Sequence, residues 1–420
     1  MAIAGLSSKG SARGGLLRST LTLLAGGALA QALPLLLGPW LTRLYSPTEF
    51  GQFAIAWALA SNLAVVGCAR YEFALPLEAD ESAASLLMAL CGRVLLTLTA
   101  VSAVAGLALF YGTGLALTWL LPLAVLAGGA TQWLTLWASR AQRFQLLAIS
   151  RVLQYGGGAL LQLGFGLLQL GALGLLLGPV LAGLATVLLL ARPAPLGGWA
   201  GLQRQPWAAL LPIAQRHRDF PLLNTPHAFA GALQDSLAML LITAWTGDAA
   251  AGYWALALRY LKAPAGLIGG ALSQVLYPRL VQTANGAEAL RVVRQAMAVL
   301  MAMAVPLMLI LMLWGPQLFV AVFGERWQDA GELARALSPY IALHFVAAPL
   351  SVATMAWKAQ AWALRLALVG QLMFVVGLVA GLYLGGLIGA AWGVSAAMGA
   401  YFGYFFWALA NWQDFPYEKA

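Results

Sequence analysis

Apolar runs long enough to cross a lipid bilayer follow one another along almost the whole chain. A membrane-spanning helix needs about 20 mostly apolar residues. Hydrophobic residues fill 62% of the 420 positions and charged residues only 9%, against roughly 25% charged residues in soluble domains. We therefore expect an all-α polytopic membrane protein of twelve spans, at residues 18–43, 50–77, 83–110, 115–138, 145–169, 171–191, 220–246, 251–277, 289–314, 331–357, 362–383 and 386–410.

Basic residues gather in alternate connections between these runs. One set of connections holds most of them, whereas the other holds little beyond Arg43, Arg326 and Arg335. Short connections rich in Lys and Arg stay in the cytoplasm, so both termini are expected there. The net charge of +9 is thus explained by topology. No dense basic patch with interleaved aromatic residues indicates nucleic-acid binding.

A longer connection at residues 193–218 divides the chain. Because it is rich in Pro and Gly and mostly basic in its charges, we interpret it as a cytoplasmic linker between an N-terminal six-helix bundle (1–192) and a C-terminal one (219–420). The two halves look related. Each has a polar turn before its second span, with a glycine (Gly51 or Gly252) and an aromatic residue one or two places later. Such a parallel repeat predicts two pseudo-symmetric bundles around a central cavity.

Five short segments at helix boundaries carry further patterns: LTRLYSPTEFGQF at 41–53, RYEFALP at 70–76, DFPLLN at 219–224, SQVLYPR at 273–279 and FGERWQDAG at 323–331. In this order they resemble the polysaccharide-transporter (O-antigen flippase) branch of the multidrug/oligosaccharidyl-lipid/polysaccharide (MOP) superfamily. The resemblance covers most of the chain.

This resemblance implies a monomeric flippase of the bacterial inner membrane, surrounded by membrane lipid. Its substrate would be an undecaprenyl-pyrophosphate-linked oligosaccharide (an O-antigen, capsule or exopolysaccharide unit), moved by alternating access. A glycan polymerase is a candidate partner.

Cationic side chains inside the predicted spans fit an anionic pyrophosphate. Ionisable residues are costly inside a membrane and usually functional, and a guanidinium group matches phosphate oxygens as a bidentate fork. From helix rise, Arg93 lies roughly 15 Å into the third span, and Arg259 and Lys262 lie roughly 12 and 17 Å into the eighth. The last two share one helix face. The candidate substrate-binding residues are Arg93, Arg259, Lys262, Arg151 and Arg70. For Arg70, at a span end, snorkelling to the interface is an equal alternative.

Two acidic residues are candidates for ion coupling or for buried ion pairs. Asp235 lies about 16 Å from the outer end of the seventh span, at a depth close to that of Lys262, and Glu72 lies near Arg70. Asp235 either pairs with Arg259 or Lys262, or binds a proton or sodium ion and so frees the cation for the pyrophosphate. No cofactor is expected, and the choice between a proton and a sodium gradient stays open.

Sequence signatures of catalysis and metal binding are missing. We find no phosphate-binding glycine loop followed by Lys-Ser or Lys-Thr and no nucleophile elbow or zinc-protease motif. Cys68 and Cys91 lie in apolar runs without metal-ligand spacing. We therefore expect no enzyme. The alternatives are a multidrug exporter of the same superfamily, which would favour acidic cavity residues, a glycan polymerase, for which only Asp235 could serve in catalysis, and a non-transporting scaffold, which has no reason to retain buried charges.

Glycine and proline add a structural expectation. The pairs Gly377–Gly381, Gly385–Gly389 and Gly399–Gly403, each four residues apart, are typical of closely packed membrane helices. Pro264, Pro306 and Pro349 lie inside predicted spans, where they remove backbone hydrogen bonds and favour kinks.

Overall fold

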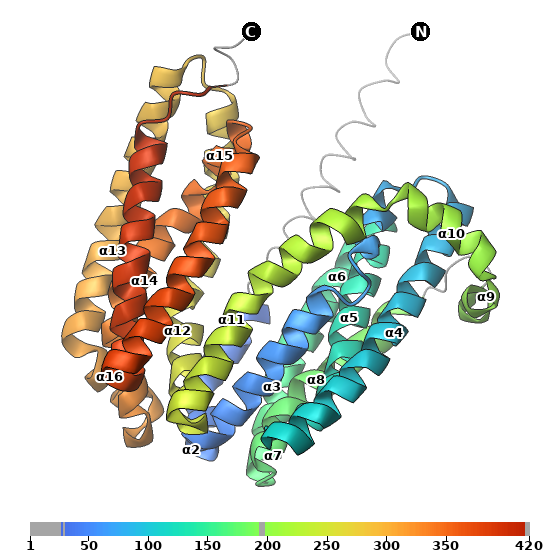
Figure 1. The fold of residues 1–420 in the computed structure, drawn as a ribbon, viewed down its shortest axis with the longest axis horizontal. Coiled ribbons are helices and arrows are strands. Elements are labelled where there is room, and N and C mark those ends of the chain that lie inside the picture. Colours follow the sequence, from blue (N-terminus) through green and yellow to red (C-terminus); the bar gives the residue numbers. More distant parts are fainter. Residues whose placement is uncertain (1–26, 28–29, 193–197, 416–420) are drawn as a thin grey trace, which may run out of the picture. The chain divides into compact units, whose positions relative to one another are not determined.

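The chain is helical throughout the part that the structure describes. The computed structural model describes residues 27, 30–192 and 198–415. Within these ranges fifteen α-helices, α2 to α16, alternate with five short 3₁₀ or π segments, η1 to η5 (Figure 1). The expected all-α class is thus confirmed.

Contacts divide the chain into two compact units. Unit 1 comprises Met1–Tyr45 and Gln52–Ser236, and unit 2 comprises Ser46–Gly51 and Leu237–Ala420. The short segment Ser46–Gly51 belongs to unit 2 because Gly51 contacts the backbone of Asp248 and Gly252.

Unit 1 is built around two central helices, α5 and α8, whose facing side chains include Ala124, Ala127, Leu176 and Val180. Small residues bring them close, since a Cβ added at Gly183 would lie 3.3 Å from that of Ala127. The helices of this unit are α2 (Gly38–Leu44), α3 (Pro47–Val65), α4 (Glu81–Thr113), α5 (Leu121–Arg140), α6 (Phe144–Arg151), α7 (Gly158–Leu167), α8 (Gly171–Leu190), α9 (Gly198–Arg204), α10 (Trp207–Arg216) and the first part of α11 (Thr225–Thr246).

Short 3₁₀ or π segments lie in four of the spans predicted in this unit. The second span ends as an α-helix at Val65 and resumes as the 3₁₀ segment η1 (Tyr71–Leu77). The fifth contains the π-helical segment η3 (Val152–Gly157), and η2 (Thr118–Leu120) precedes α5. The π segment η4 (Phe220–Asn224) begins the seventh. Such π segments are frequent at functional sites.

Unit 2 is built around α14 (Gln328–Leu350), which packs against α12, α13 and α16. Its other helices are α12 (Asp248–Val281), α13 (Gly286–Phe323), α15 (Val352–Ala356) and α16 (Gln360–Ala410), with η5 (Glu325–Trp327) before α14. Helices α12 and α13 continue through Pro264 and Pro306, whereas α14 ends one residue after Pro349.

The last helix, α16, is two helices joined at a bend. Gly385 and Gly386 have non-helical backbone angles, which agrees with the predicted boundary between spans 362–383 and 386–410. An added Cβ at Gly377 would lie 2.6 Å from the Gly393 carbonyl oxygen, and one at Gly381 would lie 2.2 Å from that of Gly389. The expected close packing therefore holds for Gly377, Gly381 and Gly389, but Gly385 forms the bend.

The third glycine pair behaves differently. A Cβ added at Gly399 or Gly403 would meet nothing within 4 Å. The prediction of close helix packing at this pair was wrong, because spacing alone does not show which face of a helix meets its neighbour.

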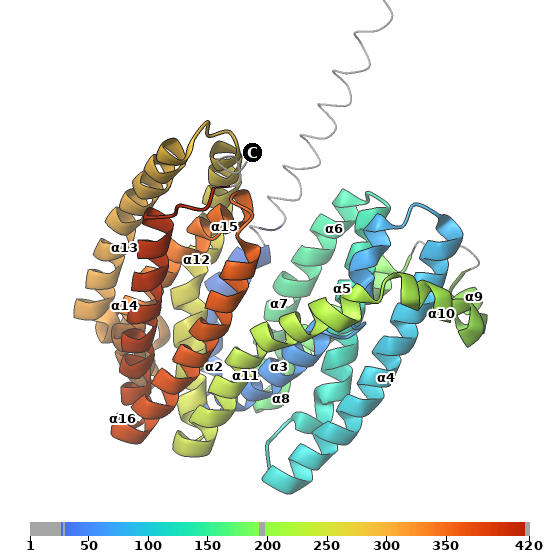
Figure 2. The ribbon, with the colours of Figure 1, turned by 45° about the horizontal axis from the view of Figure 1, so that its top comes forward.

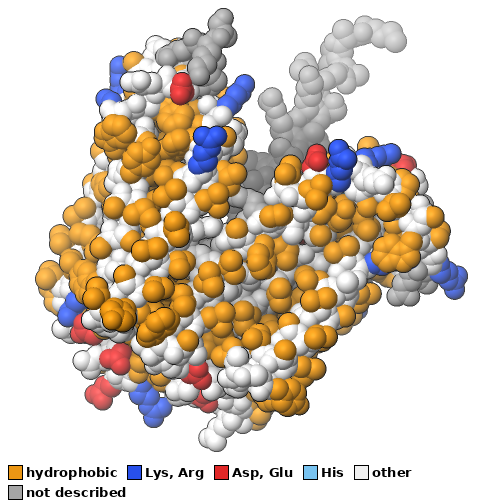
Figure 3. Space-filling model, in the orientation of Figure 1, with side chains coloured by type: hydrophobic (Ala, Val, Ile, Leu, Met, Phe, Trp, Pro, Cys, Tyr) orange, Lys and Arg blue, Asp and Glu red, His pale blue; other side chains and the backbone are white. Residues whose placement is uncertain are grey.

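The chain is a multi-pass membrane protein. Seven helical stretches in the described residues are long and apolar enough to span a bilayer, and α16 alone covers two predicted spans. On the face drawn in Figure 3, hydrophobic side chains cover the middle of the helices, while charged side chains lie near helix ends.

Helices α3 and α12 are not among the seven stretches that are long and apolar enough to span a bilayer, although they lie in predicted spans. Both carry polar residues, including Glu49 and Asn62 in α3 and Arg259 and Lys262 in α12.

Candidate functional site

The two cations of the eighth predicted span lie on α12 in unit 2. Arg259 and Lys262 are both partly buried, in an otherwise mainly apolar part of the helix. Because they are three residues apart, they lie on one face of the helix, one turn from each other. Between them, the ring of Tyr260 packs against Phe323, with centroids 4.6 Å apart. The structure thus keeps two positive charges close together inside one unit.

The start of α12 is fixed by backbone contact with the start of α3. A Cβ added at Gly51 would lie 1.7 Å from the Asp248 carbonyl oxygen, and one at Gly252 would lie 1.9 Å from that of Pro47. Only glycine permits so close an approach. The two glycines of the predicted repeat therefore face each other.

A fully buried indole supports this junction. Trp327, from the FGERW segment, is 0% exposed. Its ring makes edge contacts with Phe50 at 5.0 Å and with Tyr253 at 5.9 Å between centroids. Each partner is next to one of the two glycines in the sequence. Within unit 2, Trp327 thereby packs against the start of α3 and against the start of the helix that carries Arg259 and Lys262.

Arg93 lies in α4 of unit 1, beside the connector between the halves. Its guanidinium group donates a hydrogen bond to the Gln205 carbonyl oxygen and lies 4.6 Å from the ring centroid of Trp207. Helix rise, counted from the start of the predicted span, suggests that Arg93 lies near the bilayer midplane. However, α4 has 33 residues and a length of about 50 Å. Because this exceeds the roughly 30 Å hydrocarbon core, depth cannot be counted from its first residue. The contact places Arg93 at the level of the connector.

The described part of the connector is folded, and it packs on unit 1. Figure 2 shows α9 and α10 beside the beginning of α4. Leu202 of α9 and Leu210 and Ile213 of α10 are buried in the same cluster as side chains from the first turns of α4, whereas Trp207 and Leu211 are 65% and 60% exposed. Trp207 and Leu211, four residues apart, thus lie on an exposed face, and Leu210 and Ile213, three apart, lie on a buried one, as in an amphipathic helix. The spacing of apolar residues at 207–213 is the sequence signal for this helix. The prolines of the segment instead favour its interpretation as a linker.

The other two candidate cations of unit 1 lie at breaks in helices. Arg70 has a left-handed backbone (φ 63°) before η1, and its guanidinium group lies 4.4 Å from the ring centroid of Phe73. Arg151 is exposed where α6 passes into the π segment η3. The fold thus separates Arg70 from Arg93, since Arg70 contacts Phe73 of η1 whereas Arg93 contacts the connector.

Glu72 is enclosed in unit 1. Its side chain is 1% exposed, and Gln132 of α5 donates a hydrogen bond of 2.8 Å to Oε1. Oε2 is buried and has no hydrogen-bond partner among the described residues. A carboxyl group buried in this way is stable only when protonated or paired.

Asp235, the second acidic candidate, is exposed on α11. Its side chain or backbone interacts with at least one other group of the protein. The predicted pairing of Asp235 with Lys262 stays a prediction.

A charged cluster that sequence spacing did not suggest joins η1 to the connector. His217 Nε2 lies 3.1 Å from Glu78 Oε2, and Arg216 lies 3.6 Å from the same oxygen. Arg140 pairs with Glu81 at 2.7 Å and donates to the Glu78 carbonyl oxygen. His217 and Glu78 are 139 residues apart, too far for a local pattern to reveal their contact.

The chain is similar to known proteins in sequence family and in fold. Residues 40–332 match the family described as polysaccharide biosynthesis protein. No protein in the curated set matches the chain. Among solved structures, the lipid II flippase MurJ in an inward closed conformation has a TM-score of 0.66 at 12% identity, over 94% of this chain and 90% of that one.

Two further solved structures share the fold. A MOP superfamily transporter from Pyrococcus furiosus has a TM-score of 0.55 at 15% identity, over 94% of this chain and 95% of that one. The Vibrio cholerae MATE transporter VcmN has a TM-score of 0.52 at 16% identity, over 96% and 97%. The chain belongs to the polysaccharide biosynthesis protein family and has the fold of MOP superfamily transporters.

Proposed function

We propose that this chain is a flippase that carries an undecaprenyl-pyrophosphate-linked oligosaccharide, such as an O-antigen, capsule or exopolysaccharide unit, across the bacterial inner membrane by alternating access. Membership of the polysaccharide biosynthesis family supports the pathway class, and the MOP fold supports transport. The proposal includes twelve spans in two bundles of six helices, with both termini in the cytoplasm.

The pair Arg259 and Lys262 carries the proposal. A cation at the centre of a membrane helix costs roughly 2.5–3.5 kcal/mol on insertion scales, so two such residues one turn apart need a reason to be kept. A pyrophosphate has two adjacent anionic groups, which match two adjacent cations. A guanidinium group contributes a bidentate fork, and the lysine contributes a compact charge.

This charge pattern also separates the proposal from the main alternative. A transporter of cationic drugs would be disfavoured by two cations on one helix face, because like charges repel. An anionic, lipid-linked substrate is favoured by the same residues. In the proposal Arg70, Arg93 and Arg151 are secondary contacts for the anionic substrate. For Arg93 this requires release from Gln205 and Trp207.

We assign ion coupling first to Glu72 and second to Asp235. Glu72 is 1% exposed, whereas Asp235 is exposed. One Glu72 oxygen accepts a hydrogen bond and the other has no partner among the described residues, an arrangement that a single proton completes. These contacts favour a proton over a sodium ion, which would need several oxygen ligands.

The decisive experiment compares Arg259→Ala, Lys262→Ala and the double variant in a strain that lacks the gene. Each hydrogen bond to a charged group contributes about 1.5–3 kcal/mol, so each single substitution should reduce export of surface glycan roughly 10-fold or more. Arg259→Lys should restore only part of it. Arg291→Ala, an exposed cation on α13, is the matched control.

Extraction and analysis of membrane lipids from the deletion strain identify the substrate. Deletion of the gene should cause an undecaprenyl-linked oligosaccharide to accumulate in the inner leaflet. Normal surface glycan in the double variant, at wild-type protein level, would contradict the assigned site. Failure of any lipid-linked glycan to accumulate in the deletion strain would contradict the function itself.

A further inference from the structure

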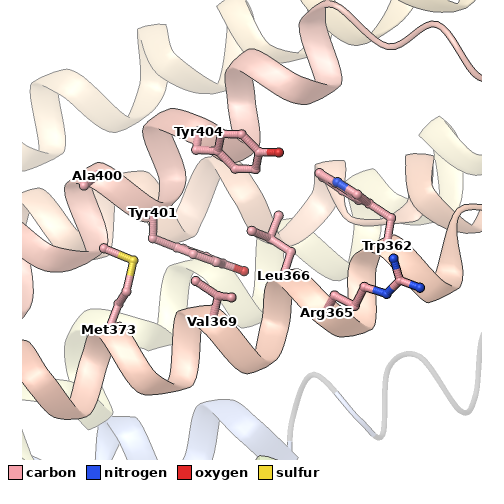
Figure 4. A pocket seen from close by; sticks show the side chains of 8 residues that line it. All are labelled: Trp362, Arg365, Leu366, Val369, Met373, Ala400, Tyr401 and Tyr404. Carbon is pink, nitrogen blue, oxygen red and sulfur yellow. The ribbon is translucent and has the colours of Figure 1, made fainter.

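A pocket of about 370 Å³ opens between the two parts of α16 in unit 2 (Figure 4). Its volume lies in the range of small-molecule sites. Tyr401 forms one wall, because its ring packs on Gly370, where an added Cβ would lie 2.7 Å from Tyr401 Cε2. The side chain of Ala400 is too small to fill the space beside it. The pocket thus follows from small residues next to one large ring.

One end of the pocket is polar and aromatic. Arg365, Trp362 and Tyr404 line this end. The Trp362 ring is fixed by Phe405, with centroids 6.2 Å apart, and by Trp412, at 5.1 Å. Arg365 is exposed and forms no hydrogen bond or ion pair with any other residue in the described ranges. An available guanidinium group therefore stands beside a rigid aromatic surface.

The rest of the pocket is apolar. Leu366, Val369 and Met373 succeed one another at spacings of three and four residues, which align on one face of the helix, and Val369 lies four residues after Arg365. Arg365 lies five residues after the start of α16 at Gln360, or roughly 8 Å along the helix. This is the zone where Trp, Tyr and Arg side chains meet lipid headgroups. The polar end therefore lies at headgroup level, and the apolar side extends toward the hydrocarbon core.

We propose that this pocket binds one anionic glycerophospholipid of the leaflet that faces Lys358. The lipid phosphate contacts the Arg365 guanidinium group, and one acyl chain lies along Leu366, Val369 and Met373. A single guanidinium group matches one phosphodiester, whereas a pyrophosphate carries more charge than one cation balances. The site is distinct from Arg259 and Lys262 on α12, and it depends on neither the glycan nor the direction of transport.

Native mass spectrometry of the purified full-length protein tests this site, with phosphatidylglycerol and phosphatidylcholine offered at equal concentration. Wild-type protein should retain phosphatidylglycerol preferentially. Arg365→Gln should reduce this adduct at least fivefold, and Arg365→Lys should reduce it less. Val369→Trp keeps the cation but fills the pocket, and it should also reduce the adduct. Arg291→Gln makes the same charge change at an exposed site outside the pocket and should leave the adduct unchanged.

Three results would overturn the proposal. Arg365→Gln could retain as much phosphatidylglycerol as the wild type, or Arg291→Gln could lose as much as Arg365→Gln, which would indicate a general charge effect. Undecaprenyl pyrophosphate at equal concentration could displace phosphatidylglycerol from wild-type protein but not bind to Arg365→Gln, which would assign the pocket to the carrier lipid. Because the readout is lipid retention, a failed flippase assignment leaves this test unaffected.

Discussion

The second helices of the two halves, α3 and α12, begin alike and end differently. Helix α3 starts with a capping box, in which the Ser46 backbone N–H donates to Glu49 at 2.7 Å and the Glu49 N–H donates to the Ser46 hydroxyl at 3.3 Å. Helix α12 starts with Asp248 in its first turn. Their glycines, Gly51 and Gly252, approach each other's backbone almost reciprocally.

Beyond this junction the helices diverge. Helix α3 ends at Val65, and after a left-handed turn at Ala69 and Arg70 the chain forms η1, which carries the enclosed Glu72. Helix α12 is unbroken over its 34 residues and carries Arg259 and Lys262. The end of α3 lets η1 place the carboxyl group of Glu72 next to Gln132. The unbroken helix α12 instead keeps Arg259 and Lys262 one turn apart. This difference matches the roles proposed above, with ion coupling assigned to Glu72 and anion binding to Arg259 and Lys262.

The largest effect is expected where the two copies are alike. Gly51→Ala and Gly252→Ala each place a Cβ within 2 Å of a carbonyl oxygen, and backbone atoms cannot move aside as a flexible side chain does. Overpacking typically costs 1–3 kcal/mol, so we expect a loss of about 3 kcal/mol or more and poor recovery of folded protein. Thermal unfolding in detergent, with size-exclusion recovery, measures this.

Gly403→Ala is the matched control for the glycine pair. An added Cβ there meets nothing within 4 Å, and replacing a helical glycine with alanine stabilises by roughly 0.5–1 kcal/mol. A wild-type melting temperature for Gly51→Ala would show that the start of α3 does not pack on α12 in the folded protein.

A second test addresses the point where the copies differ. Glu72→Gln imitates a protonated carboxyl group and keeps a partner for Gln132, so the protein should fold but lose its dependence on a proton gradient. Arg259→Ala should reduce transport yet retain that dependence. Flipping in proteoliposomes, with and without an imposed pH difference, separates the two. Gradient-dependent transport by Glu72→Gln would remove the assignment of coupling to the first copy.

Glu72→Ala adds a structural control. It removes the acceptor of the Gln132 hydrogen bond and leaves a buried donor without a partner, which costs about 1–3 kcal/mol. Its melting temperature should therefore fall below that of Glu72→Gln. Equal melting temperatures would show that the hydrogen bond does not support η1.

Sequence reasoning located the starts of these helices better than their ends. Apolar length marked the spans, and the glycines marked the repeat, because both are local properties. The end of α3 was placed at residue 77 rather than Val65, since hydrophobicity does not distinguish an α-helix from a left-handed turn followed by η1. The burial of Glu72 depends on Gln132, 60 residues away, and the position of Arg93 depends on a connector more than 100 residues away. Contacts of this kind are set by tertiary packing.

A smaller effect is expected at the third helix of the first half, α4. Trp207→Ala removes the ring beside Arg93, and an exposed cation–π contact contributes about 0.5–1 kcal/mol. Hydrogen exchange in α10 should therefore increase roughly two- to fivefold. Leu211→Ala, at a position 60% exposed on the same helix, is the control. Equal exchange in both variants would show that Arg93 does not hold the connector to α4.

The smallest effect is expected at the N-caps of the third helices of the two halves, α4 and α13. Asp80 accepts hydrogen bonds from the Ser82 hydroxyl and from the Ala83 N–H, the latter at 2.9 Å. These bonds, the Ser82 hydroxyl first, hold the pKa of Asp80 below its ordinary value. Asn285 caps α13 in the same way, accepting from the Glu288 N–H at 2.9 Å, but it does not titrate.

Because the folded pKa of Asp80 is lowered, its cap stabilises α4 fully above the ordinary carboxyl pKa, and this stabilisation is lost as the pH falls through the folded value. Amide exchange, corrected for the intrinsic rate, should show the Ala83 N–H losing protection on acidification while the Glu288 N–H keeps it. Asp80→Asn should remove the difference, since asparagine caps a helix about as well as aspartate and carries no proton to gain. Equal loss of protection at both amides in the wild type would point to general acid unfolding, with no separate contribution from the Asp80 cap.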